Sequence, residues 1–248
     1  MRVTHVYTAT IPGKTVAESI AFMARVSNPY NQANDATAER LIAYLLEHRH
    51  WSPFEMVDMC LEITTSRAIA PQILRHRSFS FQEFSQRYAE AQNFEPIEFR
   101  LQGETKQGGE ALAEIDSELQ TMVDDVVNVA NSVYNHLLAQ GVSRETARMI
   151  LPLSTRTRLY MKGSIRSWIH YIQVRTHPDT QKEHREIAEA ARLILLDWLP
   201  EIEPHLEPNI KKKCGNCEHG ANNYCKLYDF FANDENHFCK SHIHKNQL

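Results

Sequence analysis

ILRHRSFSFQEFSQRY, residues 73–88, gathers three arginines and one histidine around three serines and four aromatic side chains. Only Glu83 lies within the stretch to neutralise these cations, and clustered cations repel one another. Planar guanidinium groups bind phosphate oxygens through paired hydrogen bonds, and serine hydroxyls can donate to the same oxygens. The stretch therefore predicts a site for a phosphorylated ligand, in which the aromatic rings either cover a flat ring of that ligand or fill the core.

The simpler interpretation is that these arginines are solvated or paired with surface carboxylates, which holds for most single arginines. The density of cations and hydroxyls in the stretch argues against it. Arg166 and His170 are four residues apart in a predicted helix and share one face. For Arg156 and Arg158 we favour an exposed strand face.

Composition excludes several classes of protein. The chain has 248 residues, of which 42% are apolar and 23% charged, and a net charge of −4. These values are ordinary for a globular protein, and the negative charge argues against a non-specific nucleic-acid binder. MRVTHVYTAT, at the start, lacks the apolar core of a signal peptide, and no stretch is long enough to span a bilayer. We therefore expect a cytoplasmic protein without a membrane segment.

Hydrophobic periodicity indicates long helices beside a few strands, which predicts an α+β fold. Residues 79–85 fit neither the helical nor the strand period and are predicted to be irregular. Strands are predicted at 2–10, 56–65 and 153–163, and helices at 15–26, 36–48, 66–75, 110–139, 143–151, 164–175 and 180–197. The composition changes near Pro208, which predicts one domain over 1–207 and a second over 208–248.

The second segment carries a cysteine cluster, formed by Cys214, Cys217, Cys225 and Cys239. Four thiolates suffice for a closed tetrahedral zinc site, and so short a segment needs such a staple to fold. We therefore predict a small zinc-ribbon-like module. A disordered tail with incidental cysteines is the alternative, and four nearby histidines could replace a cysteine ligand: His219, His237, His242 and His244.

The spaced pattern R-H-R-x-x-S-x-x-E-x-S-x-R-Y, which begins at Arg75 and ends at Tyr88, resembles the signature of flavin-dependent thymidylate synthases. Further segments resemble the same family: FMARVSNP (22–29), HWSPFE (50–55), ARMILP (147–152) and SIRSWIHYIQVR (164–175). The resemblance covers about residues 1–200 and leaves the cysteine tail unexplained.

The resemblance implies a mostly helical α+β thymidylate synthase-complementing fold with a small mixed or antiparallel sheet. It also implies a homotetramer whose active sites are shared between subunits. It implies that flavin adenine dinucleotide (FAD) and deoxyuridylate (dUMP) bind each site. Methylenetetrahydrofolate would supply the carbon and NADPH would reduce the flavin, so that the products are thymidylate (dTMP) and tetrahydrofolate.

Site residues are carried over position by position. Arg175 resembles the group that favours ionisation of the uracil N3, and Arg75 would contact both ligands. The other positions that resemble dUMP contacts are Gln72, Glu83, Ser85, Gln86, Arg87 and Arg148. The positions that resemble FAD contacts, besides Arg75, are Ser52, His76, Arg77, Glu83, Ser164, Arg166 and His170. Three positions depart from the family pattern. Ser164 and Gln82 stand where the family usually has asparagine, and Met56 stands where it usually has histidine.

Cysteine chemistry offers an independent check. Outside the tail the chain holds only Cys60, in a predicted core strand without a cationic neighbour, so a reactive thiolate is poorly supported. Flavin chemistry needs no protein nucleophile. Two alternatives stay open: a dUMP hydroxymethylase of the same family, and a nucleic-acid-binding protein with a zinc module. The acidic charge and the complete motif disfavour the second.

Overall fold

The computed structural model describes residues 1–91, 93–102, 108–111 and 116–207, together with three short strands further on. The chain forms two compact units, Met1–Pro208 and Asn209–Leu248. In the second unit the described residues form an antiparallel sheet of three two-residue strands, which are β7 (Gly220–Ala221), β8 (Tyr224–Cys225) and β9 (Phe230–Phe231). Cys214, Cys217 and Cys239 lie outside the described residues, and of Cys225 only the strand position is described.

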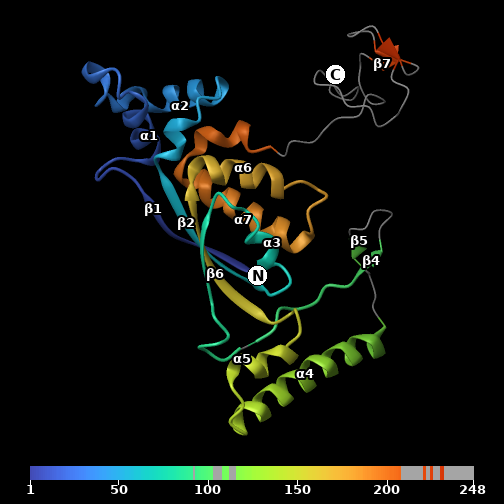
Figure 1. Ribbon diagram of the computed structural model, residues 1–248. Helices are drawn as coiled ribbons and strands as arrows, with labels where there is room; N and C mark the ends of the chain where they lie inside the picture. Colours follow the sequence, from blue (N-terminus) through green and yellow to red (C-terminus); the bar gives the residue numbers. More distant parts are fainter. Residues whose placement is uncertain are drawn as a thin grey trace. The chain divides into compact units, whose positions relative to one another are not determined.

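The first unit is built on a four-stranded antiparallel sheet with the strand order β1-β2-β6-β3 (Figure 1). Its strands are β1 (Arg2–Ala9), β2 (Asp58–Ser66), β6 (Arg156–Ser164) and the short β3 (Ser80–Glu83). The two central strands pair along their whole length, from Asp58 opposite Ser164 to Ser66 opposite Arg156. The sheet is therefore antiparallel throughout, which is one of the two arrangements that the sequence predicted.

Seven α-helices are described: α1 (Val16–Ala24), α2 (Ala38–Glu47), α3 (Ala70–Ile73), α4 (Ser117–Ala139), α5 (Arg144–Ala147), α6 (Ile165–Arg175) and α7 (Lys182–Trp198). Short 3-10 helices are η1 (Pro29–Asn31), η2 (Asp35–Thr37), η3 (Ser52–Glu55), η4 (Arg148–Ile150) and η5 (Pro200–His205), and a separate hairpin joins β4 (Arg100–Gln102) to β5 (Gly108–Ala111). Helix α1 begins with a capping box, in which Thr15 and Glu18 bond each other's backbone N–H groups.

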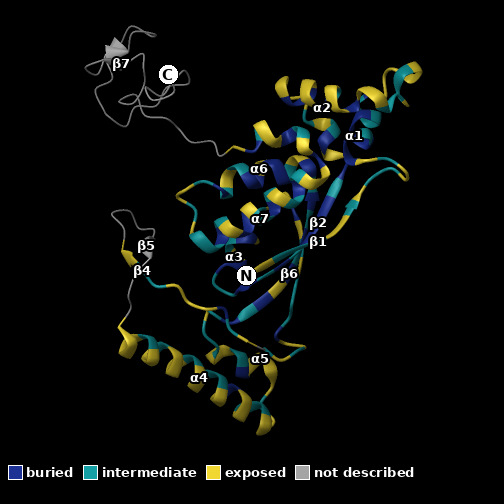
Figure 2. Cartoon of the chain, turned by 180° about the vertical axis from the view of Figure 1, so that it is seen from behind, coloured by how far each residue is buried: buried dark blue, intermediate teal, exposed yellow. Residues whose placement is uncertain are grey.

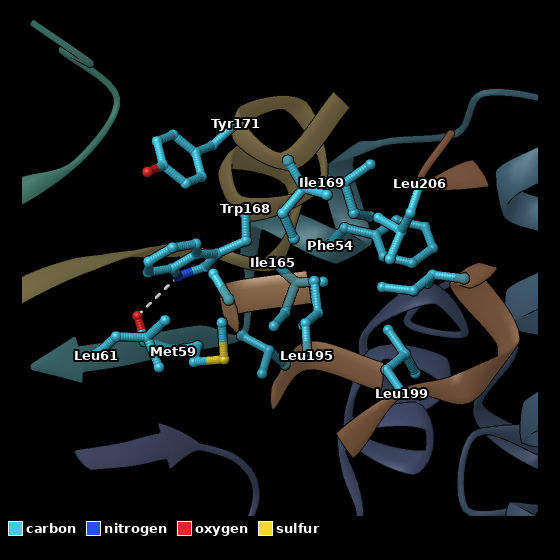
Figure 3. Close-up of a cluster of buried hydrophobic side chains, with 14 of the residues drawn as sticks. Phe54, Met59, Leu61, Ile165, Trp168, Ile169, Tyr171, Leu195, Leu199 and Leu206 are labelled. Atoms are coloured by element: carbon cyan, nitrogen blue, oxygen red, sulfur yellow. Dashed lines mark hydrogen bonds between the residues drawn. The ribbon is translucent and has the colours of Figure 1, made fainter. Parts of the chain in front are cut away.

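The core lies between one face of the sheet and helices α6 and α7, and it extends to helices α1 and α2. Alternate residues of β2 and β6 point into it, as expected for strands buried on one face. Trp168 is fully buried at its centre, and its indole N–H donates to the carbonyl oxygen of Met59 at 3.0 Å (Figure 3). Helix α6 is thereby fixed against the sheet, which sets the position of the residues on its other faces.

The opening motif is tied to this core by Phe79. Its ring packs edge-on against Trp168, with the centroids 4.9 Å apart. Gly163, on β6, makes room for it, because a Cβ at that position would lie 2.5 Å from the ring. Phe79 is therefore a core side chain, and its ring does not cover a ligand.

Three predicted elements differ from the structure. Residues 79–85, predicted to be irregular, include the edge strand β3, whose pairing with β6 has no local signal. The helix predicted over 66–75 shrinks to α3, because Ser66 is the last residue of β2 and does not cap a helix. The helix predicted from residue 110 begins at Ser117, since 108–111 form β5.

Candidate active site

The basic motif leaves the end of α3, makes a turn and enters β3. Arg75 and Arg77 project from this turn and are exposed. Among the described residues, neither forms a salt bridge with a carboxylate, whereas Arg67 pairs with Glu83. Two adjacent cations without an acidic partner are suited to an anionic ligand.

His76 lies between these arginines and links the motif to the end of α6. Its Nε2 accepts a hydrogen bond from Nε of Arg175 at 2.8 Å, across 99 positions of sequence. Burial lowers the pKa of His76 to about 4, and the electrostatic effects of Arg175 and His170 act in the same direction. The ring is therefore neutral at physiological pH, so it can accept this bond and hold the guanidinium in place.

Behind His76 lies a chain of polar side chains, which runs from fully buried His184 to exposed Gln181. Fully buried His184 contacts the hydroxyl of Tyr171 at 3.1 Å and the amide oxygen of Gln72 at 3.4 Å. The amide nitrogen of Gln72 donates to Gln181 at 2.7 Å. Sequence reasoning missed His184, although its position on the buried face of α7, with Ile187 and other residues at helical spacing, was readable from the pattern.

A cavity of about 440 Å³ opens on another face of α6. Two predicted FAD positions, Arg166 and His170, lie in its wall and are exposed. Arg166 is paired with Glu55 of η3, a contact that sequence reasoning did not foresee. The lining residues are Trp51, Glu55, Ser78, Arg166, Ser167, Ile169, His170 and Gln173.

Ser52 and Ser164 lie on elements that border this cavity. Ser52 is the exposed first residue of η3. Ser164 caps the N-terminus of α6: its Oγ accepts a hydrogen bond from the backbone N–H of Ser167 at 3.3 Å and lies 3.2 Å from that residue's hydroxyl. Ser164, although it replaces the family's usual asparagine, therefore still caps the helix.

The remaining predicted dUMP contacts form a second group near α5. Nε of Arg87 lies 3.3 Å from a carboxylate oxygen of Glu145, and Arg148 begins η4. Half-buried Ser85 and buried Gln86 precede Arg87, and the amide nitrogen of Gln86 has no hydrogen-bond partner among the described residues. In the part of the chain that the structure describes, no hydrogen bond or salt bridge joins this group to Arg75, His76 or Arg175.

Glu83 stands apart from both groups. Its Oε1 accepts hydrogen bonds from Arg67 and from the hydroxyl of Thr157, the latter at 2.9 Å. Oε1 therefore takes part in contacts within the protein, and Oε2 is the oxygen that remains for a ligand.

These donors fit the chemistry of FAD. Arg75 and Arg77 can neutralise a diphosphate, and the cavity wall combines apolar rings with hydrogen-bonding groups, as sites for flat cofactors do. The predicted contacts therefore remain compatible with the cofactor.

Cys60 has a cationic neighbour, contrary to the sequence-based expectation. It lies opposite Lys162 in the β2–β6 pair and is 5% exposed. Burial raises the pKa of its thiol, and the smaller opposing effect of Lys162 does not reverse this. The thiol is therefore a poor nucleophile, as the sequence indicated for a different reason.

Within the described ranges, no group of three or more His, Cys, Asp or Glu side chains is arranged to hold a metal ion. None of the helices described is both long and apolar enough to cross a membrane.

Comparison with known proteins gives consistent results. Residues 10–201 match the family described as thymidylate synthase complementing protein. The chain is 52% identical over 192 residues to a flavin-dependent thymidylate synthase of Synechocystis sp., a match that covers 76% of this chain and 88% of that relative. It is 45% identical over 197 residues to a probable flavin-dependent thymidylate synthase of Paramecium bursaria Chlorella virus 1, covering 78% and 91%.

A solved structure also resembles this one. The UMP/dUMP methylase PolB from Streptomyces cacaoi, bound with 5-Br dUMP, aligns with a TM-score of 0.69 and 28% sequence identity. The alignment covers 82% of this chain and 93% of that one. With the complete R-H-R-x-x-S-x-x-E-x-S-x-R-Y pattern, these matches show that the chain belongs to the family of flavin-dependent thymidylate synthases.

Proposed function

We propose that this protein methylates dUMP to dTMP, with methylenetetrahydrofolate as carbon donor and NADPH as the reductant of a bound FAD. The observation that carries the proposal is the contact between Arg175 and His76. His76 lies between Arg75 and Arg77, and neither arginine forms a salt bridge with a carboxylate among the residues that the structure describes. The contact joins Arg175 to the residue between Arg75 and Arg77, and such a group of cations suits the anionic parts of a nucleotide and a flavin. The 52% identity to a flavin-dependent thymidylate synthase supports the same function.

In this proposal Arg175 acts on the pyrimidine. Its Nε is committed to His76, so its two terminal nitrogens remain for a ligand. A guanidinium beside the edge of uracil stabilises negative charge that develops at N3, and this makes C5 more nucleophilic. Arg75 and Arg77 bind phosphate oxygens. When bound, FAD supplies the hydride that completes the methyl group.

The test is the identity of the product. Purified protein, supplied with dUMP, methylenetetrahydrofolate and NADPH, should yield dTMP and tetrahydrofolate, measured by chromatography with mass spectrometry. A hydroxymethylated nucleotide would instead identify the second family activity. The absence of any flavin absorbance in the purified protein, together with no product after FAD is added, would overturn the proposal.

We propose that the site is completed by a second copy of the chain, in a homotetramer. Helix α4 is exposed along almost its whole length (Figure 2), and Tyr134 is its one buried residue among those described. It carries an apolar stripe, with exposed fractions between 44% and 65%, formed by Leu119, Met122, Val126, Val129 and Val133. The spacing of three and four residues is that of a helix–helix seam.

The stripe favours a helical partner, and the separation of the two groups of predicted dUMP contacts favours a site shared between copies. Val126→Glu places a charge in the stripe and should reduce the mass measured by light scattering. Asn128→Glu, on the opposite face of α4, is the matched control and should keep the mass of the parent. If both variants keep it, the interface lies elsewhere.

We propose that residues 208–248 bind one zinc ion through Cys214, Cys217, Cys225 and Cys239, and that residues 1–207 carry the chemistry. The proposal rests on four thiolates in a short segment with little apolar content. Metal analysis of protein prepared without chelators should give about one zinc per chain. The zinc should be lost in Cys214→Ser/Cys217→Ser, while dTMP formation continues. Zinc-free parent protein would contradict the proposal.

A further inference from the structure

A line of four side chains runs from the core to Gln181. Tyr171 and His184 are fully buried, and their hydroxyl oxygen and Nε2 are 3.1 Å apart. Nδ1 of His184 lies 3.4 Å from Oε1 of Gln72, at the long end of the hydrogen-bond range. Nε2 of Gln72 donates to Oε1 of Gln181 at 2.7 Å. The line joins three helices, because Tyr171 comes from α6, Gln72 from α3 and His184 from α7.

Taken alone, the two glutamines have no preferred orientation. A carboxamide has nearly the same shape when its oxygen and nitrogen are exchanged. If the amides of Gln72 and Gln181 both turned over, the contact between them would persist with donor and acceptor reversed. The side of Gln72 that meets a ligand would then offer different chemistry.

Tyr171 removes this ambiguity. Its hydroxyl has one hydrogen, and His184 is its one hydrogen-bond partner among the described residues. If His184 donated to the tyrosine oxygen, that hydrogen would be buried without an acceptor, a penalty that corresponds to roughly a tenfold population difference or more. The favoured state therefore has Tyr171 donating to Nε2.

The imidazole of His184 links the orientation of the Tyr171 hydroxyl to the orientation of the Gln72 amide. Burial, together with the charge of Arg175 and the neighbouring His76, lowers the pKa of His184 to about 3, so the ring is neutral. A neutral ring that accepts at Nε2 carries its hydrogen on Nδ1, and Nδ1 must meet the amide oxygen of Gln72. Nε2 of Gln72 then donates one hydrogen to Gln181 and keeps a second for a ligand.

We propose that Tyr171 and His184 are positioning residues that fix which side of the Gln72 amide meets the nucleotide. The inference rests on the proposed function, because Gln72 is a predicted dUMP contact. The second N–H of Gln72 is directed at an acceptor of the pyrimidine nucleotide, such as a carbonyl oxygen of uracil. A histidine that merely filled the core would leave nucleotide affinity unchanged.

The experiment measures the dUMP dissociation constant of the flavin-loaded protein by equilibrium dialysis. Tyr171→Phe/His184→Leu removes the line without leaving an unpaired hydroxyl, and should raise the constant roughly five- to tenfold, the loss of about one net hydrogen bond. Tyr171→Phe alone keeps Nδ1 beside Gln72 and removes only the preference for one orientation of the amide. It should therefore raise the constant by a smaller factor, about twofold, because the two orientations become equally populated.

Exposed Gln181 gives a second test, which does not disturb the core. Gln181→Glu can only accept, so it supports the native orientation of Gln72. Gln181→Lys can only donate, so it supports the reversed one. We expect the lysine variant to bind dUMP several-fold more weakly than the glutamate variant, although its charge attracts an anionic nucleotide.

The outcomes separate the two proposals. A parent protein that does not bind dUMP refutes the proposed function and this inference with it. If the parent binds dUMP but the folded double variant binds it equally well, the positioning role alone is wrong. The same follows if Gln181→Lys binds more tightly than Gln181→Glu, and this comparison decides the matter if the double variant does not fold.

Discussion

Lowering the pH should unfold this protein in part through the buried imidazole of His184. Burial lowers its pKa from the ordinary 6.5 to about 3, and Arg175 and His76 contribute. Between those two values the unfolded chain binds a proton that the folded chain excludes. The stability that follows from the neutral ring is present above about pH 6.5 and is lost as the pH falls towards 3.

The magnitude follows from these two values. At pH 5 an imidazole in the unfolded chain is almost fully protonated, whereas His184 in the folded chain is not. With about 1.4 kcal/mol for each unit of pH below the ordinary pKa, this residue alone lowers the free energy of unfolding by about 2 kcal/mol between pH 7.5 and pH 5.

The assay is urea unfolding followed by tryptophan fluorescence, at one protein concentration because an oligomer's stability depends on it. Carboxylates also titrate in this range, so the useful quantity is a difference between proteins. His184→Asn should lose about 2 kcal/mol less than the parent over the same pH interval. His48→Asn, which removes an exposed imidazole, should follow the parent. Equal losses in all three proteins would refute a neutral, buried His184.

Three further substitutions test the site and its support. Gly163→Ala puts a Cβ against the ring of Phe79 and should lower the free energy of unfolding by roughly 1–3 kcal/mol, measured by urea unfolding; an unchanged value would show that the ring can move aside. Arg75→Ala should weaken both FAD retention and dUMP binding, each about ten- to a hundredfold, and intact binding of both ligands would remove it from the site. Arg175→Lys keeps the charge but cannot both donate to His76 and present a planar pair of donors; turnover should fall far more than dUMP affinity, and equal losses in a kinetic assay would make Arg175 a binding residue only.

The sequence by itself determined the family and most of the elements. The spaced motif from Arg75 to Tyr88 is a local pattern, so it can be read without coordinates. Helices α1, α2, α6 and α7 follow hydrophobic periodicity, and Thr15 with Glu18 marks the start of α1. The roles of the site residues remain predictions from the resemblance.

Only the tertiary structure decided which of these residues touch. The bond between Arg175 and His76 and the contact between Gln72 and His184 join segments 99 and 112 positions apart, and no local pattern encodes either. The same holds for β3, which becomes a strand because β6 offers it an edge to pair with. Hydrophobic periodicity indicates which face of a single helix or strand packs against the core. Contacts between distant side chains depend on how several elements pack together, and packing is a property of the whole chain.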